Sequence, residues 1–274
     1  MSTLPTLPEA IWGSLWKFIV GFVSFPIVAR GSGLLLESAR QRWEAANAAR
    51  RVISTQLDPL LKAADELQGK LRSLAEEDFQ EFRLIPSTDA TAANLVNLCS
   101  TLYLFAQFWA RLEILRRESF HAELTKNRQG KLLMSFLRCL ESKHVRLVDR
   151  AWQRAIGESV FAQAKPPADV ITFKEFVEHY EDVQRLREWV RPLEEILRET
   201  RFRRARQRLL QYGVIVQALI DTLDPKHHTT RERPAYPNKL SRRAKRDLIG
   251  RVFGTYLQEV KYVQKYTGVS SSTK

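Results

Sequence analysis

The only adjacent histidines in the chain, His227-His228, follow Asp221 and Asp224 closely enough to raise the question of a metal ion. A zinc site needs three or four nitrogen, sulfur or oxygen ligands that converge on one point. Neighbouring histidines point in different directions, and this spacing matches no known ligand pattern. We therefore expect a solvated loop without metal or cofactor. His121 and His179, each two residues before a glutamate, are interpreted in the same way.

Cys99 is the residue that could act as a nucleophile, which would require exposure and a neighbouring base. It lies within an apolar run at helical spacing, so we expect a buried, inert thiol. The chain contains no phosphate-binding glycine loop, nucleophile elbow or zinc-protease motif. Its two cysteines, Cys99 and Cys139, favour reduced thiols in a cytosolic compartment over a secreted disulfide framework. The sequence therefore favours a protein that is not an enzyme.

Positive charge is concentrated at the C-terminal end of the chain. The formal net charge is +13, yet residues 1–200 hold 27 Lys and Arg against 26 Asp and Glu. Residues 201–274 hold 17 against 5. Such an asymmetry indicates an anionic partner for the last quarter of the chain, either a lipid surface or a nucleic acid.

Most of this positive charge lies in two clusters of basic residues, each at a position where it destabilises a helix. Between residues 200 and 220 no carboxylate is present, and like charges one turn apart repel. The second cluster opens the last expected helix, where cations oppose the helix dipole. We predict an anion-binding or lipid-binding surface, the alternative being a solvated face paired with acidic helices elsewhere. Its residues are Arg201, Arg203, Arg204, Arg206, Arg208, Arg242, Arg243, Lys245 and Arg246.

Near the N-terminus, the 19 residues from 11 to 29 carry a single charge, Lys17. As a helix they would span about 28 Å, close to the roughly 30 Å of a bilayer's hydrocarbon core. We therefore predict a membrane anchor, with an in-plane helix or one docked on the protein's own bundle as the alternatives. The expected membrane-facing side chains are Trp12, Trp16, Phe18, Phe22 and Phe25.

The flanks of this segment predict its orientation. No Lys or Arg precedes it, whereas five arginines follow it: Arg30, Arg40, Arg42, Arg50 and Arg51. The positive-inside rule then places the N-terminus outside and the remaining chain in the cytoplasm, as in a single-pass membrane protein.

Helical spacing dominates the rest of the chain. A long helical stretch follows Gly31-Ser32-Gly33, with a break expected at Asp58-Pro59. Beyond this break, Leu60, Ala64, Leu67, Leu71 and Leu74 form a narrow apolar seam. Residues 90–110 form a second uncharged run, but amides interrupt it, so we interpret it as the central core helix rather than a membrane span.

In the C-terminal half, helical spacing interrupted by prolines predicts several further helices. Pro166-Pro167 indicates a linker, and Thr172 with Glu175 predicts a capping box at the start of the next helix. A short strand over 170–173 is an alternative at this point. One helix is expected from Pro192 to Leu223, a functional or disordered loop over 224–240, and a last helix from Ser241 to Gln264.

Together these patterns predict an all-α, elongated bundle of six to nine helices with an N-terminal apolar helix. The expected regions are 1–30 as anchor, 31–165 as bundle, and 166–274 as a basic region continuous with or packed on that bundle. The expected role is a non-enzymatic, membrane-anchored scaffold facing the cytoplasm, with membrane lipid and a protein as partners. The alternative is a soluble protein associated with nucleic acid.

Overall fold

A computed structural model describes residues 9–83, 92–119, 124–162, 169–182 and 184–268, and for most of residues 9–42 it describes the backbone only. The predicted all-α class is confirmed, because these residues contain helices and no strand. Instead of a strand over 170–173, Phe161 and Val170 form an isolated antiparallel bridge. The helices are α1 Glu9–Glu76, α2 Gln80–Arg83, α3 Ala92–Ser119, α4 Arg128–Leu140, α5 Arg150–Glu158, α6 Phe173–Asp182, α7 Gln184–Arg198, α8 Arg203–Leu223, α9 Arg242–Asp247, α10 Gly254–Tyr256 and α11 Val263–Thr267.

The chain divides into two compact units, Met1–Ala48 and Ala49–Lys274, and α1 contributes to both. The predicted membrane segment, with its side chains Trp12, Trp16, Phe18, Phe22 and Phe25, lies outside the residues whose side chains are described. Among the residues that are described, no helix combines the length and the apolar character needed to cross a bilayer. The side-chain contacts and surfaces described below belong to the second unit.

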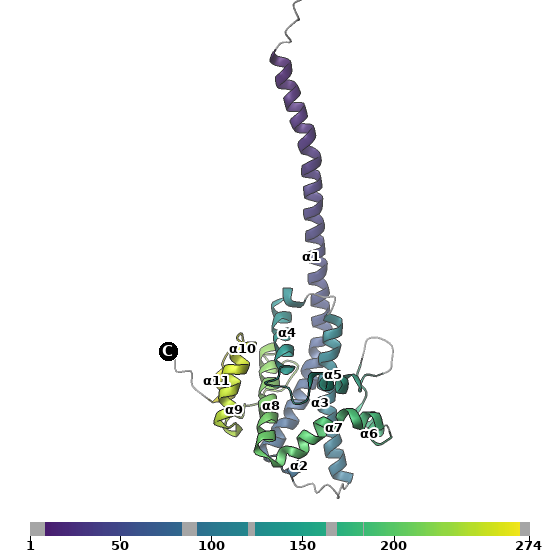
Figure 1. Ribbon diagram of the computed structural model, residues 1–274, viewed down its shortest axis with the longest axis vertical. Coiled ribbons are helices and arrows are strands. Elements are labelled where there is room, and N and C mark those ends of the chain that lie inside the picture. The colour runs from purple at the N-terminus through teal and green to yellow at the C-terminus, as the bar shows by residue number, and fades with distance from the viewer. Residues whose placement is uncertain (1–8, 84–91, 120–123, 163–168, 183, 269–274) are drawn as a thin grey trace, which may run out of the picture. The chain divides into compact units, whose positions relative to one another are not determined.

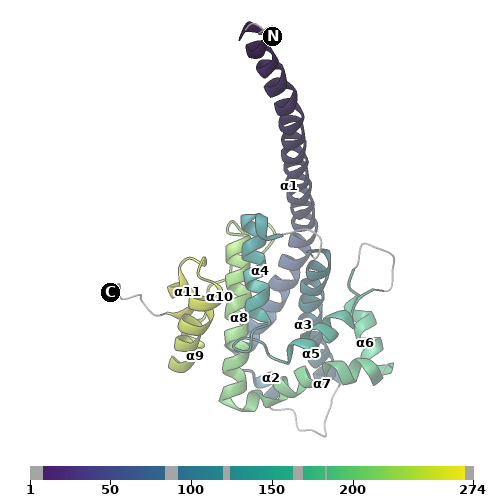
Figure 2. The same cartoon turned by 45° about the horizontal axis from the view of Figure 1, so that its top comes forward.

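Helix α3 forms the centre of the second unit, as predicted for residues 90–110. Leu102, Phe105 and Trp109 are buried along it. The Trp109 indole Nε1 donates a hydrogen bond of 2.7 Å to the hydroxyl of Tyr212 on α8, so the two long helices share one buried polar contact. Figures 1 and 2 show α8 between the C-terminal helices and the second half of α1.

The predicted seam of α1 is confirmed, because its five apolar side chains are almost completely buried. The predicted helix break at Asp58-Pro59 is wrong, and so is the one at Gly31-Ser32-Gly33, since α1 runs through both. At Pro59 the helix forfeits one backbone hydrogen bond. Burial of Leu60, Leu61 and Ala63 directly after it holds the helix in register.

The helix expected from Pro192 to Leu223 is in fact two helices. Pro192 lies inside α7, and the interruption falls later, at the 3₁₀ turn Glu199–Arg201. There the buried Thr200 hydroxyl donates to the carbonyl of Leu197, and Phe202 adopts an extended conformation before α8 begins. The boundary between the two helices therefore lies at Thr200 and not at Pro192.

The last expected helix is also shorter and less regular than predicted. Ser241 caps α9 by accepting a hydrogen bond from the Ala244 amide at 3.2 Å, as expected. A π-helical segment, Leu248–Phe253, then leads into α10, which ends at Tyr256. These short segments also raise the number of helices above the six to nine expected.

Candidate anion-binding surface

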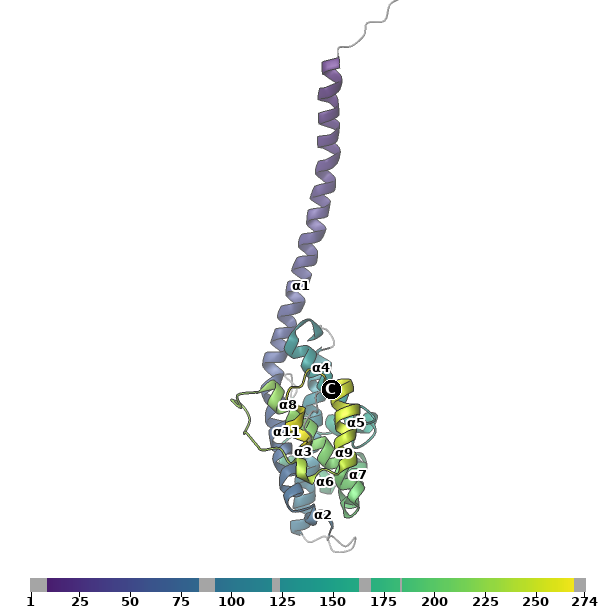
Figure 3. The same ribbon diagram turned by 90° about the vertical axis from the view of Figure 1, so that its left-hand side faces the viewer.

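The packing of α9 on α8 brings the two predicted basic clusters together. Gln207 and Gln211 lie on one face of α8 and bind the segment that starts α9. Gln207 Nε2 donates to the carbonyl of Lys239 at 3.0 Å, and its Oε1 accepts from the Ser241 amide at 2.7 Å. Gln211 Nε2 donates to the carbonyl of Ala244 at 3.2 Å. In Figure 3, where α9 and α11 face the viewer, these helices lie in front of α8.

Six arginines of the two clusters are exposed: Arg201 lies over the ring of Phe202, and the other five flank the contact between α8 and α9. Arg203 and Arg204 precede Gln207 by about one helical turn, so helical spacing places them toward the side of α8 that carries Gln207. On α9, Ala244 is buried against α8, while the arginines on either side of it are exposed. Within the described part of the chain, none of the five has a carboxylate at ion-pairing distance. We call this set the basic surface: Arg203, Arg204, Arg242, Arg243 and Arg246.

Two other predicted site residues, Arg206 and Arg208, bind groups of the protein itself, and a third, Lys245, is half-buried. The Arg206 guanidinium lies 3.3 Å from Asp78 and donates to the carbonyls of Thr200 and Arg201. Arg208 is half-buried and donates to the carbonyl of Leu147 at 2.6 Å; burial lowers the pKa of its guanidinium. Lys245 is half-buried near Gly268. These three cations are therefore less available to an external anion.

Apolar side chains are exposed next to the basic surface. Phe202, the residue before α8, is 56% exposed, and the guanidinium of Arg201 lies 4.8 Å above its ring centroid. Ile249 follows Arg246 by three residues and is 37% exposed. Exposed apolar groups among cations are typical of proteins that bind at a membrane interface.

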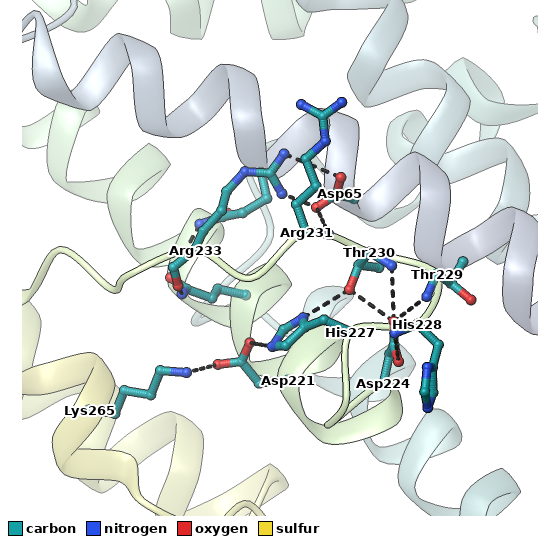
Figure 4. Close-up of polar contacts among 12 residues, drawn as sticks. Asp65, Asp221, Asp224, His227, His228, Thr229, Thr230, Arg231, Arg233 and Lys265 are labelled. Carbon is teal, nitrogen blue, oxygen red and sulfur yellow. Dashed lines mark hydrogen bonds and ion pairs between the residues drawn. The ribbon is translucent and has the colours of Figure 1, made fainter.

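The loop after α8, predicted to be functional or disordered, is held in place by polar contacts that Figure 4 shows. Asp224 accepts hydrogen bonds from the amides of His228, Thr229 and Thr230 and from the Thr230 hydroxyl, at 2.9–3.0 Å. The following residues, 229–239, run along α1 and are called the strap. The strap contacts α1 at Asp58, Asp65, Arg72 and Glu76, all on one side of that helix.

The Asp224 carboxylate should make the stability of this loop sensitive to acid. Burial alone would raise the pKa of this carboxyl, but the hydrogen bonds from Thr229, His228 and Thr230 outweigh it and lower the pKa below the usual 3.8. The unfolded chain therefore binds this proton more readily, so the stabilisation is present above pH 4 and is lost as the pH falls through the lowered pKa. Asp224→Asn should cost about 1–2 kcal/mol at pH 7.

Urea unfolding of both chains at pH 7 and near pH 3 measures this effect. The gap in unfolding free energy between wild type and Asp224→Asn should narrow at the lower pH. A gap of the same size at both pH values would show that the carboxylate charge contributes nothing to the loop.

The other residues considered for chemistry are the two cysteines and the histidines. Burial raises the pKa of the Cys99 thiol to about 11 and that of Cys139 to about 12. His227 Nδ1 lies 3.0 Å from the Thr230 hydroxyl within the strap network. Across the described residues, no three side chains of His, Cys, Asp or Glu cluster as metal ligands would. His121 lies outside the described residues, and His179 is exposed on α6.

In comparisons with known proteins, no family model, no curated protein and no solved structure matches this chain.

Proposed function

We propose that this chain is a non-enzymatic helical protein that docks its basic surface on an anionic phospholipid membrane. The observation that supports this most directly is the group of five exposed arginines without carboxylate partners among the described residues. Each cation close to an anionic leaflet adds about 1 kcal/mol of attraction. The neighbouring Phe202 and Ile249 could enter the headgroup region, which phosphate contacts on a nucleic acid would not require.

The N-terminal segment 11–29 completes the proposal as a membrane anchor. Its support is its sequence, 19 residues with one lysine followed by several arginines. An anchored chain needs only a weak second contact, because tethering raises the local concentration of the basic surface at the membrane. In this arrangement the body faces the cytoplasm, and the helical surfaces remain available to a protein partner.

Sedimentation of the full-length chain with lipid vesicles tests the proposal. Vesicles of phosphatidylcholine alone report any contribution of the anchor, and vesicles that also contain phosphatidylserine report the basic surface. Changing all five arginines of the basic surface to Gln should weaken the phosphatidylserine-dependent part of binding at least tenfold, equivalent to about 1.4 kcal/mol. Added salt should weaken it further, since the contact is electrostatic.

A matched variant controls for the loss of net charge. It carries five other exposed cations changed to Gln, namely Lys62, Arg138, Lys143, Arg150 and Arg185. Equal losses in the two variants would mean that net charge, not the basic surface, drives binding, and would reject the proposal. Release of the bound chain by carbonate washing would reject the spanning anchor.

Nucleic acid is the second candidate for the same surface, because exposed arginines also bind phosphate backbones. Retention on DNA or RNA that falls in the five-arginine variant, together with no preference for phosphatidylserine, would favour this candidate.

A further inference from the structure

A cleft lies on a different part of the second unit, between the start of α4, the end of α8, the turn that follows α8 and the segment that leads into α11. Its volume is about 610 Å³, which is in the range of small-molecule sites. None of the arginines of the basic surface lines it. Whatever the cleft binds is therefore independent of the membrane proposal.

The floor of the cleft is a polar network centred on Asp221, near the end of α8 (Figure 4). Its carboxylate accepts hydrogen bonds from Lys265 Nζ at 2.7 Å and the Tyr266 hydroxyl at 2.9 Å. His227 Nε2 lies 3.7 Å from the same carboxylate. Burial raises the pKa of Tyr266, so its hydroxyl remains a donor at neutral pH. The floor is thereby fixed in position before any ligand enters.

The rim of the cleft has an excess of positive charge. Two of the lining carboxylates already have cation partners: Asp221 pairs with Lys265, and Glu259 lies 3.2 Å from Lys131. Arg128, Lys226 and Lys261 also line the cleft, and no carboxylate in the described residues pairs with them. Glu232 alone offsets these three cations. The cleft thus favours an anionic ligand, and side chains of this kind bind phosphate oxygens.

Tyr262 places an aromatic ring at the same rim, and its backbone is in an unfavourable conformation. Tyr262 is 77% exposed and adopts a left-handed conformation with φ of 58°. His227, also lining the cleft, has φ of 50°. For residues other than glycine this conformation is unfavourable, and such strain is concentrated where ligands are held. An exposed tyrosine ring next to unpaired cations suits a ligand that carries both a planar ring and phosphate.

We propose that this cleft binds a nucleoside phosphate. The base stacks on Tyr262, and the phosphates lie against Arg128, Lys226 and Lys261. Glu232, the remaining carboxylate of the rim, is positioned to accept hydrogen bonds from sugar hydroxyls.

Calorimetric titration of the full-length chain with ADP, with pyrophosphate as the second probe, tests this proposal. ADP should bind at one site and more tightly than pyrophosphate. Changing Arg128 and Lys261 together to Gln should weaken both probes about tenfold. Tyr262→Gly should weaken ADP and leave pyrophosphate unchanged, because it removes the stacking ring while glycine adopts the positive φ without strain. Lys143→Gln, an exposed cation outside the cleft, is the matched control.

Three outcomes would overturn the proposal. The first is an absence of ADP binding at millimolar concentration. The second is ADP binding that survives the Arg128 and Lys261 changes but is lost in the five-arginine variant, which would place the anion on the basic surface. The third is pyrophosphate binding as tight as that of ADP and equal loss of both in Tyr262→Gly, which would reject the nucleoside.

Discussion

Gly213→Ala should lower the free energy of unfolding by about 2–3 kcal/mol, because the space for a methyl group is already filled. A Cβ at Gly213 on α8 would lie 2.2 Å from the hydroxyl oxygen of Tyr236, at the end of the strap. Tyr236 is buried and its ring is rigid, so the hydroxyl cannot turn aside. Relief requires the strap to move away from α8. Urea unfolding followed by tryptophan fluorescence measures the loss.

A second substitution separates this collision from a general effect on the helix. Tyr236→Phe removes the colliding oxygen and by itself should change stability by less than about 1 kcal/mol, since at most one neutral hydrogen bond is lost. Combined with Gly213→Ala, it should recover most of the lost stability. The matched control is Gly130→Ala, whose Cβ would lie 2.2 Å from the backbone carbonyl of Leu124. No recovery by Tyr236→Phe in the Gly213→Ala background would contradict the assigned contact.

Local spacing in the sequence was sufficient to predict the parts of the fold that depend on neighbours along the chain. The apolar seam of α1 and the core helix α3 follow from helical periodicity, and both are buried as expected. The capping box is also confirmed, with the Thr172 amide bound to Glu175 at 2.6 Å. These features need only residues within a few positions of one another, so a sequence reveals them.

Proline was a misleading marker of helix ends in this chain. Pro59 and Pro192 both suggested helix starts, yet both lie inside helices. Each forfeits one hydrogen bond, a cost that burial of apolar neighbours such as Leu60 and Leu193 offsets. Tertiary packing thus overrode the local preference.

The sequence could not predict which arginines are exposed and which bind groups of the protein itself. Arg204 and Arg208 belong to one stripe of α8, yet Arg204 is exposed while Arg208 binds the carbonyl of Leu147. The two arginines differ because the segment around Leu147, 61 residues earlier in the sequence, contacts Arg208. The cleft could not be predicted for the same reason, because its lining combines α4 residues such as Leu132 with residues from Asp221 onward and contains no motif.

The strap has no helical period or turn motif that would attach it to α1, yet it contributes one of the strongest polar contacts of the fold. Arg233 forms a bidentate ion pair with Asp65, and both side chains are less than a fifth exposed. The Arg231 amide also donates to Asp65. The carbonyl of Arg233 accepts from Gln217 Nε2 at 2.8 Å, so this residue joins the strap to both α1 and α8.

Asp65→Ala should therefore cost about 3 kcal/mol, near the lower end of the range for breaking a buried ion pair. The substitution leaves the Arg233 guanidinium without its carboxylate in a site that burial already makes unfavourable for charge, as the lowered pKa of Arg233 indicates. Most of the cost comes from this uncompensated cation. Changing Arg233 to Met in the same chain should consequently restore more than half of the loss, because an apolar side chain of similar length can fill the space.

Asp58→Ala provides the matched comparison for this experiment. Asp58 is exposed two turns earlier on the same side of α1, and it contacts the strap through a hydrogen bond of 3.3 Å from the Thr229 hydroxyl. Its loss should cost less than about 0.5 kcal/mol, the level of most surface substitutions. Urea unfolding ranks the three variants, and limited proteolysis within the strap shows whether the lost stability is local. Equal effects of Asp58→Ala and Asp65→Ala would mean that the ion pair does not hold the strap on α1.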